Sequence, residues 1–372
     1  MKILLGGIPL GCDNIGDEAI IACVVKMLKE SIPGVELTVA TADPGTAGRL
    51  GVGTVPAFGF AGTPMDGFAV AVRRHDAYVW CGATGLSDYP DVGLGLLEVA
   101  QGAGVPTYVW GVGMDDELNP VFFRAHGGRR LLLSCLWLVG WYETRLRTGL
   151  ARRVSRVLSR CRGVWLRDPE SAAVLAKTGF PGAKVAADTA ILLRMESTLP
   201  NLHSQLGLCI STQRQVADLG GLKRMIAAVR ASGAKVVGIP MNPKTDRALM
   251  ESIGVECIEG DTPEAVCEAA ARCNVVLSSR LHLLILAANV GTPILGIARG
   301  SKLANWLANF GRTVEGSVYD CDWDKVTEHV LAALGGRGDW DAVRDRAYAG
   351  LLARLEKARG EFVESLEACR VG

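Results

Sequence analysis

The feature that most constrains this chain is the alternation of short apolar runs with longer amphipathic stretches along most of its length. Several of the runs end in glycine or a small polar residue, which is typical of parallel strands joined by helical crossovers. In the first half, strands are predicted at residues 2–7, 36–41, 77–81, 107–111, 163–167 and 184–187. Helices are predicted there to begin near Asp17, Val92, Pro120, Leu146 and Pro169.

The alternation starts again after residues 194–205, a segment that carries a proline and fits neither the helical nor the strand period. Strands are predicted at 207–211, 235–239, 275–278 and 293–297, and helices at 216–231, 262–272, 281–288 and 303–309. The pattern predicts an α/β protein with two Rossmann-like, doubly wound domains facing a cleft, in which strand carboxyl ends bind the ligand. We place the domains at 1–195 and 206–340, and expect residues 341–372 to form a helix that packs back across the junction.

Composition excludes several classes of protein. Hydrophobic residues make up 49% of the chain and charged residues 21%, which is enough apolar surface for large cores. A formal net charge of +1 argues against nucleic-acid binding. The eleven cysteines show no zinc-type spacing, so we expect no metal site and buried, reduced thiols. No apolar run reaches the length of a spanning helix or resembles a signal peptide, so a cytoplasmic location is expected.

A polar turn after the first predicted strand is the first candidate site. Its glycines lack the spacing of a dinucleotide-binding fingerprint. Asp13 and Asn14 lie in the turn itself, where a carboxylate can act as an acid or base. Asp17 and Glu18 follow at the predicted helix start, where a chemical role and simple helix capping are equally good interpretations.

Cations follow two successive strands of the second domain. Arg280 and His282 stand at a predicted strand-to-helix junction, and Arg299 and Lys302 follow the next strand. Taken singly, Arg280 could pair with a carboxylate and His282 could be a satisfied helix-start residue. Together they predict a site for an anion that carries more than one charge. In the first domain, Arg167 precedes Asp168 at a similar junction, where a local ion pair or helix cap is as good an interpretation as ligand binding.

These segments resemble the polysaccharide pyruvyl transferase family over nearly the whole chain. The motifs that carry the resemblance are DNIGDEA at 13–19, CGATG at 81–85, LRDPES at 166–171, ADTAILL at 187–193, and SSRLHLLILAANVGTPILGI at 278–297 followed by Lys302. The resemblance implies a GT-B-like arrangement, phosphoenolpyruvate as donor, and a sugar acceptor, free or lipid-linked, of a cell-surface glycan. The product would be a pyruvate ketal, with release of phosphate and no cofactor or metal.

Matched to the family's motifs, Arg167, Arg280, His282 and Lys302 fall at positions that bind phosphoenolpyruvate or take part in catalysis. We expect Arg299 and Asn14 to assist binding. His282 is a candidate for one proton-transfer role and Asp13 or Asp17 for the other, and the sequence leaves the assignment open. CGATG replaces a run of glycines that is usual in the family, which puts acceptor recognition in doubt.

Two other functions remain alternatives. A GT-B glycosyltransferase that uses a nucleotide sugar would need acids near the end of the second domain, and Asp320, Asp322 and Asp324 lie there. A non-catalytic glycan-binding relative would have the fold without the chemistry, although Arg280, His282 and Lys302 are all present.

An arginine-rich stretch runs from Arg124 to Arg162 and contains the apolar run LLLSCLWLVGWY and a single acid, Glu143. Basic and aromatic residues together favour contact with an anionic membrane surface or a polyprenyl-diphosphate carrier. The alternative, which the sequence favours slightly, is a buried helix followed by a solvated arginine face.

Overall fold

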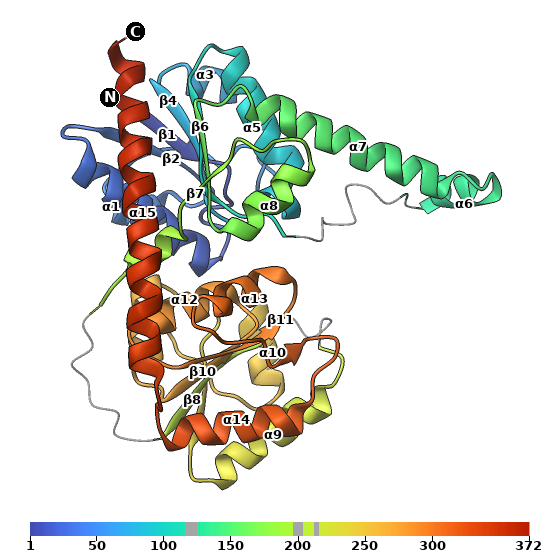
Figure 1. Cartoon of the computed structure of the whole chain (residues 1–372), viewed down its shortest axis with the longest axis vertical. Helices are drawn as coiled ribbons and strands as arrows, with labels where there is room; N and C mark the ends of the chain where they lie inside the picture. Colours follow the sequence, from blue (N-terminus) through green and yellow to red (C-terminus); the bar gives the residue numbers. More distant parts are fainter. Residues whose placement is uncertain (116–124, 126, 196–203, 212–215, 372) are drawn as a thin grey trace. The chain divides into compact units, whose positions relative to one another are not determined.

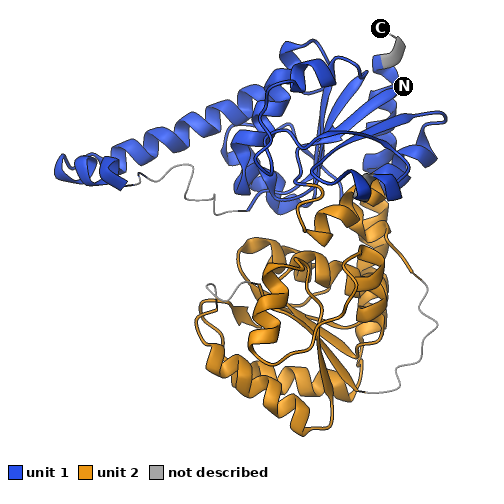
Figure 2. Ribbon diagram, turned by 180° about the vertical axis from the view of Figure 1, so that it is seen from behind, with its two compact units in different colours: residues 1–9, 25–187, 356–372 blue, residues 10–24, 188–355 orange. Residues whose placement is uncertain are grey.

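A computed structural model describes residues 1–115, 125, 127–195, 204–211 and 216–371. The chain forms two compact units (Figure 2). Unit 1 comprises Met1–Pro9, Val25–Ala187 and Glu356–Gly372, and unit 2 comprises Leu10–Val24 and Asp188–Leu355. The turn after the first strand therefore belongs to unit 2, and the last helix contributes residues to both units.

Unit 1 is built on a parallel sheet with the strand order β3-β2-β1-β4-β5-β6-β7 (Figure 1). Its strands are β1 (Lys2–Gly6), β2 (Glu36–Thr41), β3 (Gly53–Pro56), β4 (Ala77–Cys81), β5 (Thr107–Val112), β6 (Gly163–Leu166) and β7 (Lys184–Val185). Its helices are α2 (Pro44–Arg49), α3 (Phe68–Val72), α4 (Gly85–Asp88), α5 (Pro90–Gly102), α6 (Gly127–Cys135), α7 (Val139–Leu158) and α8 (Pro169–Lys177). Helix α1 (Ile15–Ser31) begins in unit 2 and ends in unit 1.

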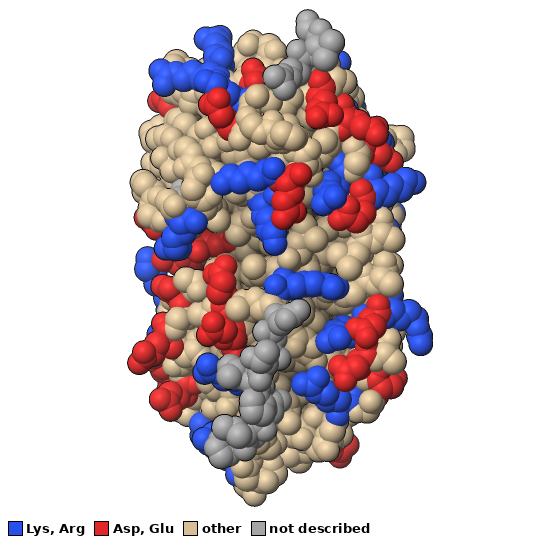
Figure 3. All heavy atoms as spheres, turned by 90° about the vertical axis from the view of Figure 1, so that its left-hand side faces the viewer, with Lys and Arg blue, Asp and Glu red and all other residues tan. Residues whose placement is uncertain are grey.

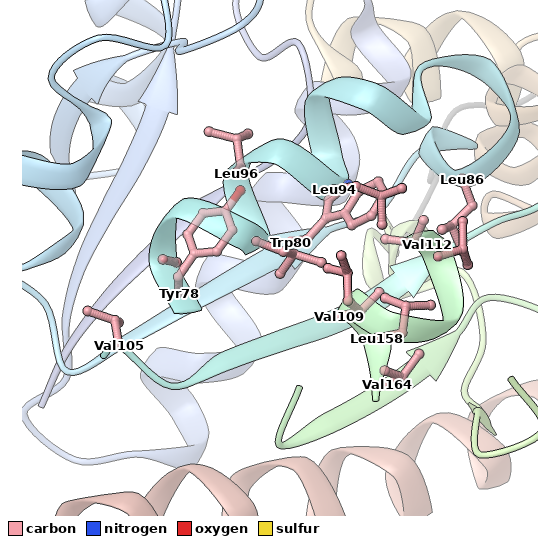
Figure 4. Packing of buried hydrophobic residues seen from close by; sticks show 14 of the residues in the cluster. Tyr78, Trp80, Leu86, Leu94, Leu96, Val105, Val109, Val112, Leu158 and Val164 are labelled. Carbon is pink, nitrogen blue, oxygen red and sulfur yellow. The ribbon is translucent and has the colours of Figure 1, made fainter. Parts of the chain in front are cut away.

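Alternating side chains give the unit 1 sheet two buried faces. Tyr78 and Trp80 of β4 point to the same face and pack with Val109 of β5 and Leu94 of α5 (Figure 4). A Cβ atom on Gly93 would lie 2.3 Å from the Trp80 ring, so the indole packs directly on the backbone of α5. Glycine at this position lets α5 approach the sheet closely.

An aromatic cluster covers the opposite face. Tyr108 and Trp110 of β5 and Trp165 of β6 alternate with the residues of the first face, and Phe362 of α15 (Trp340–Val371) stacks on Trp110 with ring centroids 4.7 Å apart. The Tyr108 hydroxyl donates to the Ser365 carbonyl at 2.8 Å. The carboxyl-terminal part of α15 is thus an integral layer of unit 1.

Unit 2 contains a smaller parallel sheet with the strand order β12-β11-β10-β8-β9. Its strands are β8 (Gln205–Cys209), β9 (Lys235–Gly238), β10 (Val275–Ser278), β11 (Ile294–Ala298) and β12 (Gly316–Ser317). Its helices are α9 (Leu219–Ala231), α10 (Thr245–Ser252), α11 (Pro263–Ala271), α12 (Leu281–Asn289), α13 (Ser301–Ala308) and α14 (Trp323–Gly335), with the short 3-10 helix η2 (Thr189–Leu192). Leucines and valines of β8 and β10 pack against α9 and α14.

In each sheet the chain first adds strands on one side of the starting strand, β1 or β8, and then adds the later strands on the opposite side. This switch falls between β1 and β4 in unit 1 and between β8 and β10 in unit 2. Ligands of doubly wound folds bind beside such a switch, outside the carboxyl ends of the strands. In unit 2 that edge carries the turn after β10, where Arg280 lies.

The doubly wound α/β class predicted from the sequence is confirmed, and all ten predicted strands occur with shifts of one or two residues at some ends. Two strands were missed. β3 is a partly exposed edge strand containing glycine and proline, and β12 has two residues, so neither forms an apolar run. Helices α2, α3, α4, α10 and α14 were also missed. Helix α7 begins at Val139, so the predicted start near Leu146 was wrong.

Two predictions fall wholly or partly outside the described residues. They are the helix near Pro120 and residues 196–203 of the expected linker.

None of the helices in the described residues is long and apolar enough to cross a membrane. One face of the molecule shows acidic and basic side chains interspersed, in keeping with the formal net charge of +1 (Figure 3).

We predict that Phe362→Ala destabilises unit 1 by about 3–5 kcal/mol, because Phe362 is fully buried among three aromatic rings. Hydrogen exchange should then increase in β5 and β6. Phe310→Ala, a matched change of a buried ring in unit 2, should leave β5 and β6 protected. Unchanged exchange in these strands of the Phe362 variant would mean that α15 is not part of the core of unit 1.

Candidate functional site

The turn between β1 and α1 lies on unit 2, where a backbone hydrogen bond fixes it. The Ile15 amide donates to the Met241 carbonyl at 3.0 Å. Gly11 and Asp13 have φ angles of 75° and 59°, so two residues of the turn adopt left-handed backbone conformations before the helix starts. The Asn14 side-chain oxygen accepts from the Gly16 amide at 3.2 Å and so caps α1.

Asp17 is buried within unit 2, with an exposed fraction of 2%. The Asn14 side-chain amide donates to Asp17 Oδ2 at 2.7 Å. Burial raises the pKa of Asp17 to about 6, against the opposing effects of His282, the Asn14 hydrogen bond, Lys302 and Arg280. Asp17 can therefore gain or lose a proton near neutral pH, which a surface capping residue would not do.

His282 lies directly against the start of α1. A Cβ atom on Gly16 would lie 2.2 Å from His282 Nδ1, so only glycine leaves room for the imidazole. On the other side, His282 Nε2 lies 3.4 Å from Asp188 Oδ2. Both atoms are buried, and the Asp188 carboxylate is the acid nearest to this side of the ring. His282 thus lies between the helix start and a buried acid.

Asp188 is fixed by the helix that carries His282. The Asp188 Oδ1 atom caps η2 by accepting from the Ala190 amide at 3.0 Å. Asn289, at the end of α12, donates to the carbonyls of Ala190 and Leu193 at 2.8 and 2.9 Å. Since His282 is at the start of α12, these bonds join the segment that carries the acid to the helix that carries the imidazole.

Arg280 forms a two-pronged ion pair with Asp246. Arg280 Nε and Nη2 donate to the two carboxylate oxygens at 3.0 and 2.6 Å. Asp246 is fully buried and also accepts from the amides of Met241 and Asn242 at 3.2 and 2.9 Å. Burial by itself would lower the pKa of Arg280, but Asp246 raises it above the ordinary value. The pairing that the sequence allowed as a structural role therefore exists.

Two serines shape the turn that presents Arg280. The Ser278 hydroxyl accepts from the Arg280 amide at 2.8 Å, and the Ser279 hydroxyl accepts from the Ser211 amide at 2.8 Å. The Asp246 fork uses the Nε and Nη2 edge of the guanidinium, and arginine has further N–H groups on Nη1. A fixed guanidinium with remaining donors can bind an anion with little loss of side-chain entropy.

Lys302 lies in the first turn of α13, directly after β11, and is half-buried. Its charge lowers the pKa of Asp17, as do those of His282 and Arg280, so these four residues form one electrostatic cluster in unit 2. We call Asp17, Arg280, His282 and Lys302 the unit 2 cluster. Arg299, which is also half-buried, precedes Lys302 in the loop between β11 and α13.

Asp13 differs from Asp17 in its surroundings. Lys244 Nζ lies 2.6 Å from Asp13 Oδ2, and the Asp13 side chain is 39% exposed. Asp13 is therefore a partly exposed, ion-paired residue, whereas Asp17 belongs to the unit 2 cluster.

Arg167 lies in unit 1, at the carboxyl end of β6. It is buried, and its Nε donates to Asp168 Oδ2 at 3.0 Å. Asp168 Oδ1 also caps α8 by accepting from the Ser171 amide at 2.6 Å. The guanidinium lies over Gly113, where an added Cβ would be 2.5 Å from Nη2. Both structural roles considered for this pair are thus present, and Arg167 is not part of the unit 2 cluster.

Sequence analysis missed four residues that build the site: Gly16, Asp188, Lys244 and Asp246. Asp246 is 34 residues from Arg280 in sequence and lies in the first turn of α10. An acid at this position is usually interpreted as a capping residue, so nothing in the sequence indicated its pairing. Asp188 lies in the ADTAILL motif, which signalled the family but indicated no role. The acids that the glycosyltransferase alternative would need include Asp322, whose carboxylate caps α14 by accepting from the Lys325 amide at 3.1 Å.

The fold is that of GT-B glycosyltransferases and the related epimerases. The chain is similar to the UDP-GlcNAc 2-epimerase from Neisseria meningitidis, with 14% identity, a TM-score of 0.57, and 99% of this chain and 100% of that chain covered. It is similar to the UDP-GlcNAc 2-epimerase of Methanocaldococcus jannaschii, with 10% identity, a TM-score of 0.58, and coverage of 91% and 94%. A ugt transferase from Siraitia grosvenorii gives 12% identity, a TM-score of 0.54, and coverage of 99% and 100%. At these identities the likeness concerns the fold alone.

A family model gives the more specific assignment. Residues 14–301 match the polysaccharide pyruvyl transferase model, so the chain belongs to this family of transferases. The matched range includes Asn14, Asp17, Arg167, Arg280 and His282, and it ends one residue before Lys302. No curated protein sequence matches the chain.

We predict that Gly16→Ala displaces the His282 ring, because the new methyl group would overlap the imidazole. The variant should lose about 1–3 kcal/mol of unfolding free energy through overpacking. The NMR signals of His282, one of only five histidines, should shift. Gly350→Ala is the control, since Gly350 lies in helix α15 with no atom within 4 Å of an added Cβ. Unchanged His282 signals in the Gly16 variant would contradict the contact.

We predict that Asp17→Asn stabilises the protein at neutral pH. The pKa of Asp17 is about 6 in the folded protein, against an ordinary value of 3.8. The folded protein is therefore most stable, as far as this group is concerned, below about pH 4, where Asp17 is protonated in both states, and it loses that stability as the pH rises through 6. The asparagine variant should exceed the parent by roughly 1–3 kcal/mol above pH 6, and the gain should vanish near pH 4. Urea unfolding across this range checks it, with Asp13→Asn, a change at a partly exposed acid, as the control. A gain that did not depend on pH would argue against a buried titrating Asp17.

Proposed function

We propose that this chain transfers the pyruvyl group of phosphoenolpyruvate to a sugar hydroxyl pair, forming a ketal and releasing phosphate. The acceptor would be a sugar of a cell-surface glycan or of its lipid-linked precursor. Membership of the polysaccharide pyruvyl transferase family supports the reaction class. The observation that carries the proposal is the unit 2 cluster, in which two cations and an imidazole surround a buried acid whose pKa is raised to about 6.

The cations suit the donor. Phosphoenolpyruvate carries a phosphate and a carboxylate, so it needs cationic contacts at two places. Arg280 is held in one orientation by Asp246 and can contact one anionic group through Nη1. Lys302, at the start of the neighbouring helix α13, can contact the other, with Arg299 and Asn14 assisting. The start of α12 adds backbone N–H groups and a favourable dipole beside Arg280.

The reaction requires balanced proton transfers. A proton added to the C3 methylene of phosphoenolpyruvate gives a methyl group and an oxocarbenium-like C2. One sugar hydroxyl loses its proton and attacks C2. A second hydroxyl then attacks as the bond between C2 and the phosphate oxygen breaks, and its proton leaves with the phosphate. Two hydroxyl protons are therefore consumed, one by the methyl group and one by phosphate, through groups that titrate near neutral pH.

His282 and Asp17 fit these proton transfers best. The His282 side chain is 14% exposed, so it can reach a substrate, and its Nε2 lies 3.4 Å from Asp188 Oδ2. Asp17, with a pKa of about 6, can exchange a proton with the same site near pH 7. Asp13 is less suited, because Lys244 pairs with its carboxylate at 2.6 Å. We therefore assign the transfers to His282 and Asp17 and give Asp188 a positioning role.

Separate variants should distinguish binding from proton transfer. Lys302→Met keeps the aliphatic stem but removes a charge-assisted contact, so phosphoenolpyruvate should bind roughly tenfold to hundredfold more weakly. His282→Asn should leave affinity nearly unchanged and reduce turnover by about a hundredfold or more. Calorimetry and phosphate release with a panel of sugars measure the two effects. We avoid Arg280→Ala because it would leave the Asp246 charge buried and unpaired.

Lys325→Met, a change at an exposed lysine of α14, is the matched control and should alter neither quantity. Phosphoenolpyruvate should also raise the melting temperature of the parent protein, since it binds the native state. If a nucleotide sugar stabilised the protein and phosphoenolpyruvate did not, the glycosyltransferase alternative would replace this proposal.

A further inference from the structure

Helices α6 and α7 form a hairpin that projects from the rest of unit 1 (Figures 1 and 2). α6 contains no buried residue, and in α7 the buried residues are Val154, Val157 and Leu158, at the end nearest the sheet. The base of the hairpin is fastened by Arg153, which pairs with Glu98 and Asp91 at 2.8 and 2.6 Å. The far part of the hairpin therefore has little core of its own.

The end of the hairpin exposes a concentration of apolar side chains. Of eight large hydrophobic residues that are exposed in the described residues, six lie here. We call these six residues the apolar tip: Leu131, Leu132, Leu136, Trp137, Leu138 and Trp141. The alternative of a buried apolar helix, which the sequence favoured slightly, is therefore wrong. Clustered exposed apolar residues of this size mark a contact surface.

Trp137 gives a second, independent sign of contact. It lies in the turn between the two helices, is 95% exposed, and has a φ of 57°. A side chain in this left-handed conformation costs roughly 1 kcal/mol, which glycine would avoid. Trp137 gains little from burial in the folded chain, so packing within the protein does not explain a tryptophan at this position. Strain that the fold itself does not require is typical of a functional surface.

The helices behind the tip are strongly basic. Between Gly127 and Leu158 there are seven arginines and one acid, Glu143. Arg129 lies 5.5 Å from the ring centroid of Tyr142, and Arg145 lies 5.4 Å from that of Trp141. Arg145 thus lies on a ring of the apolar tip, and Arg129 lies on the ring of the residue that follows it in sequence. The mixture of charges on the face shown in Figure 3 contrasts with this predominantly basic segment.

We propose that the α6–α7 hairpin docks on an anionic membrane surface, with the apolar tip inserted among the lipid headgroups and acyl ends. Tryptophan favours this boundary, and arginines beside it attract anionic lipids. A second copy of the chain fits less well, because it would bring two arginine-rich segments of like charge together. No helix in the described residues could cross a membrane, which agrees with docking at the interface. The inference does not depend on the proposed function.

Flotation with vesicles tests the proposal. The full chain should float with vesicles that mix phosphatidylcholine and phosphatidylglycerol, and much less with phosphatidylcholine alone. Rising salt should weaken binding. Arg129→Glu/Arg130→Glu should reduce partitioning by roughly thirtyfold or more, since each basic residue near such a surface contributes about 1 kcal/mol. Trp137→Ser should reduce it about tenfold, from the loss of one inserted ring.

Matched controls lie elsewhere on the surface. Lys223→Glu/Arg224→Glu in α9 makes the same change in net charge at two exposed neighbours, and Tyr319→Ser removes an aromatic side chain that is 64% exposed. Neither should alter partitioning. Cys135, at the end of α6, is the one exposed cysteine among the eleven, so an environment-sensitive dye attached there should shift to the blue on anionic vesicles.

Three outcomes would overturn the proposal: no flotation with anionic vesicles, equal reduction by the control pair, or a dye signal that does not respond to vesicles. A dimer in sedimentation that Trp137→Ser converts to a monomer, without any vesicle binding, would assign the tip to self-association instead.

Discussion

The buried carboxylate of Asp246 holds the site in unit 2 together. It accepts two hydrogen bonds from Arg280, at the end of β10, and two from the backbone amides of Met241 and Asn242, after β9. The Met241 carbonyl in turn accepts from Ile15 and fixes the start of α1. The α1 start and the Arg280 turn are thus both joined to the segment that runs from Met241 to Asp246. Removing one partner of such a buried pair costs about 3–5 kcal/mol, because the remaining charge is left uncompensated.

The same construction determines the electrostatics of the cluster. Because the bond from Ile15 to Met241 fixes the start of α1 within unit 2, Gly16 can lie against His282, and Asp17 can lie near Arg280 and Lys302. Burial raises the pKa of Asp17, and the neighbouring cations limit the rise. An anionic donor bound by the cations would oppose their effect and raise the affinity of Asp17 for a proton further. Binding of an anion by these cations would in this way be coupled through charge to protonation of Asp17.

Local patterns in the sequence predicted the two doubly wound sheets and the positions of Arg280, His282 and Lys302, because each follows the end of an apolar strand. Longer-range features could not be read in this way. Asp13 and Asp17 were both candidates for the same proton transfer, and only the fold gives one an exposed lysine partner and the other a buried position. Asp246 pairs across 34 residues, a distance that local spacing does not encode. The apolar run in α6 and α7 looked like a core helix, since composition does not reveal that its large side chains are exposed among the described residues.

Transfer from phosphoenolpyruvate in deuterium oxide, with the donor labelled by carbon-13 at C3, tests the central claim most directly. If the unit 2 cluster delivers a solvent-derived proton to the methylene carbon, NMR of the product should show a ketal methyl group with one deuterium. One phosphate should be released for each ketal formed. A labelled product without deuterium in the methyl group, or no transfer to any acceptor under conditions in which a nucleotide sugar is consumed, would contradict the account.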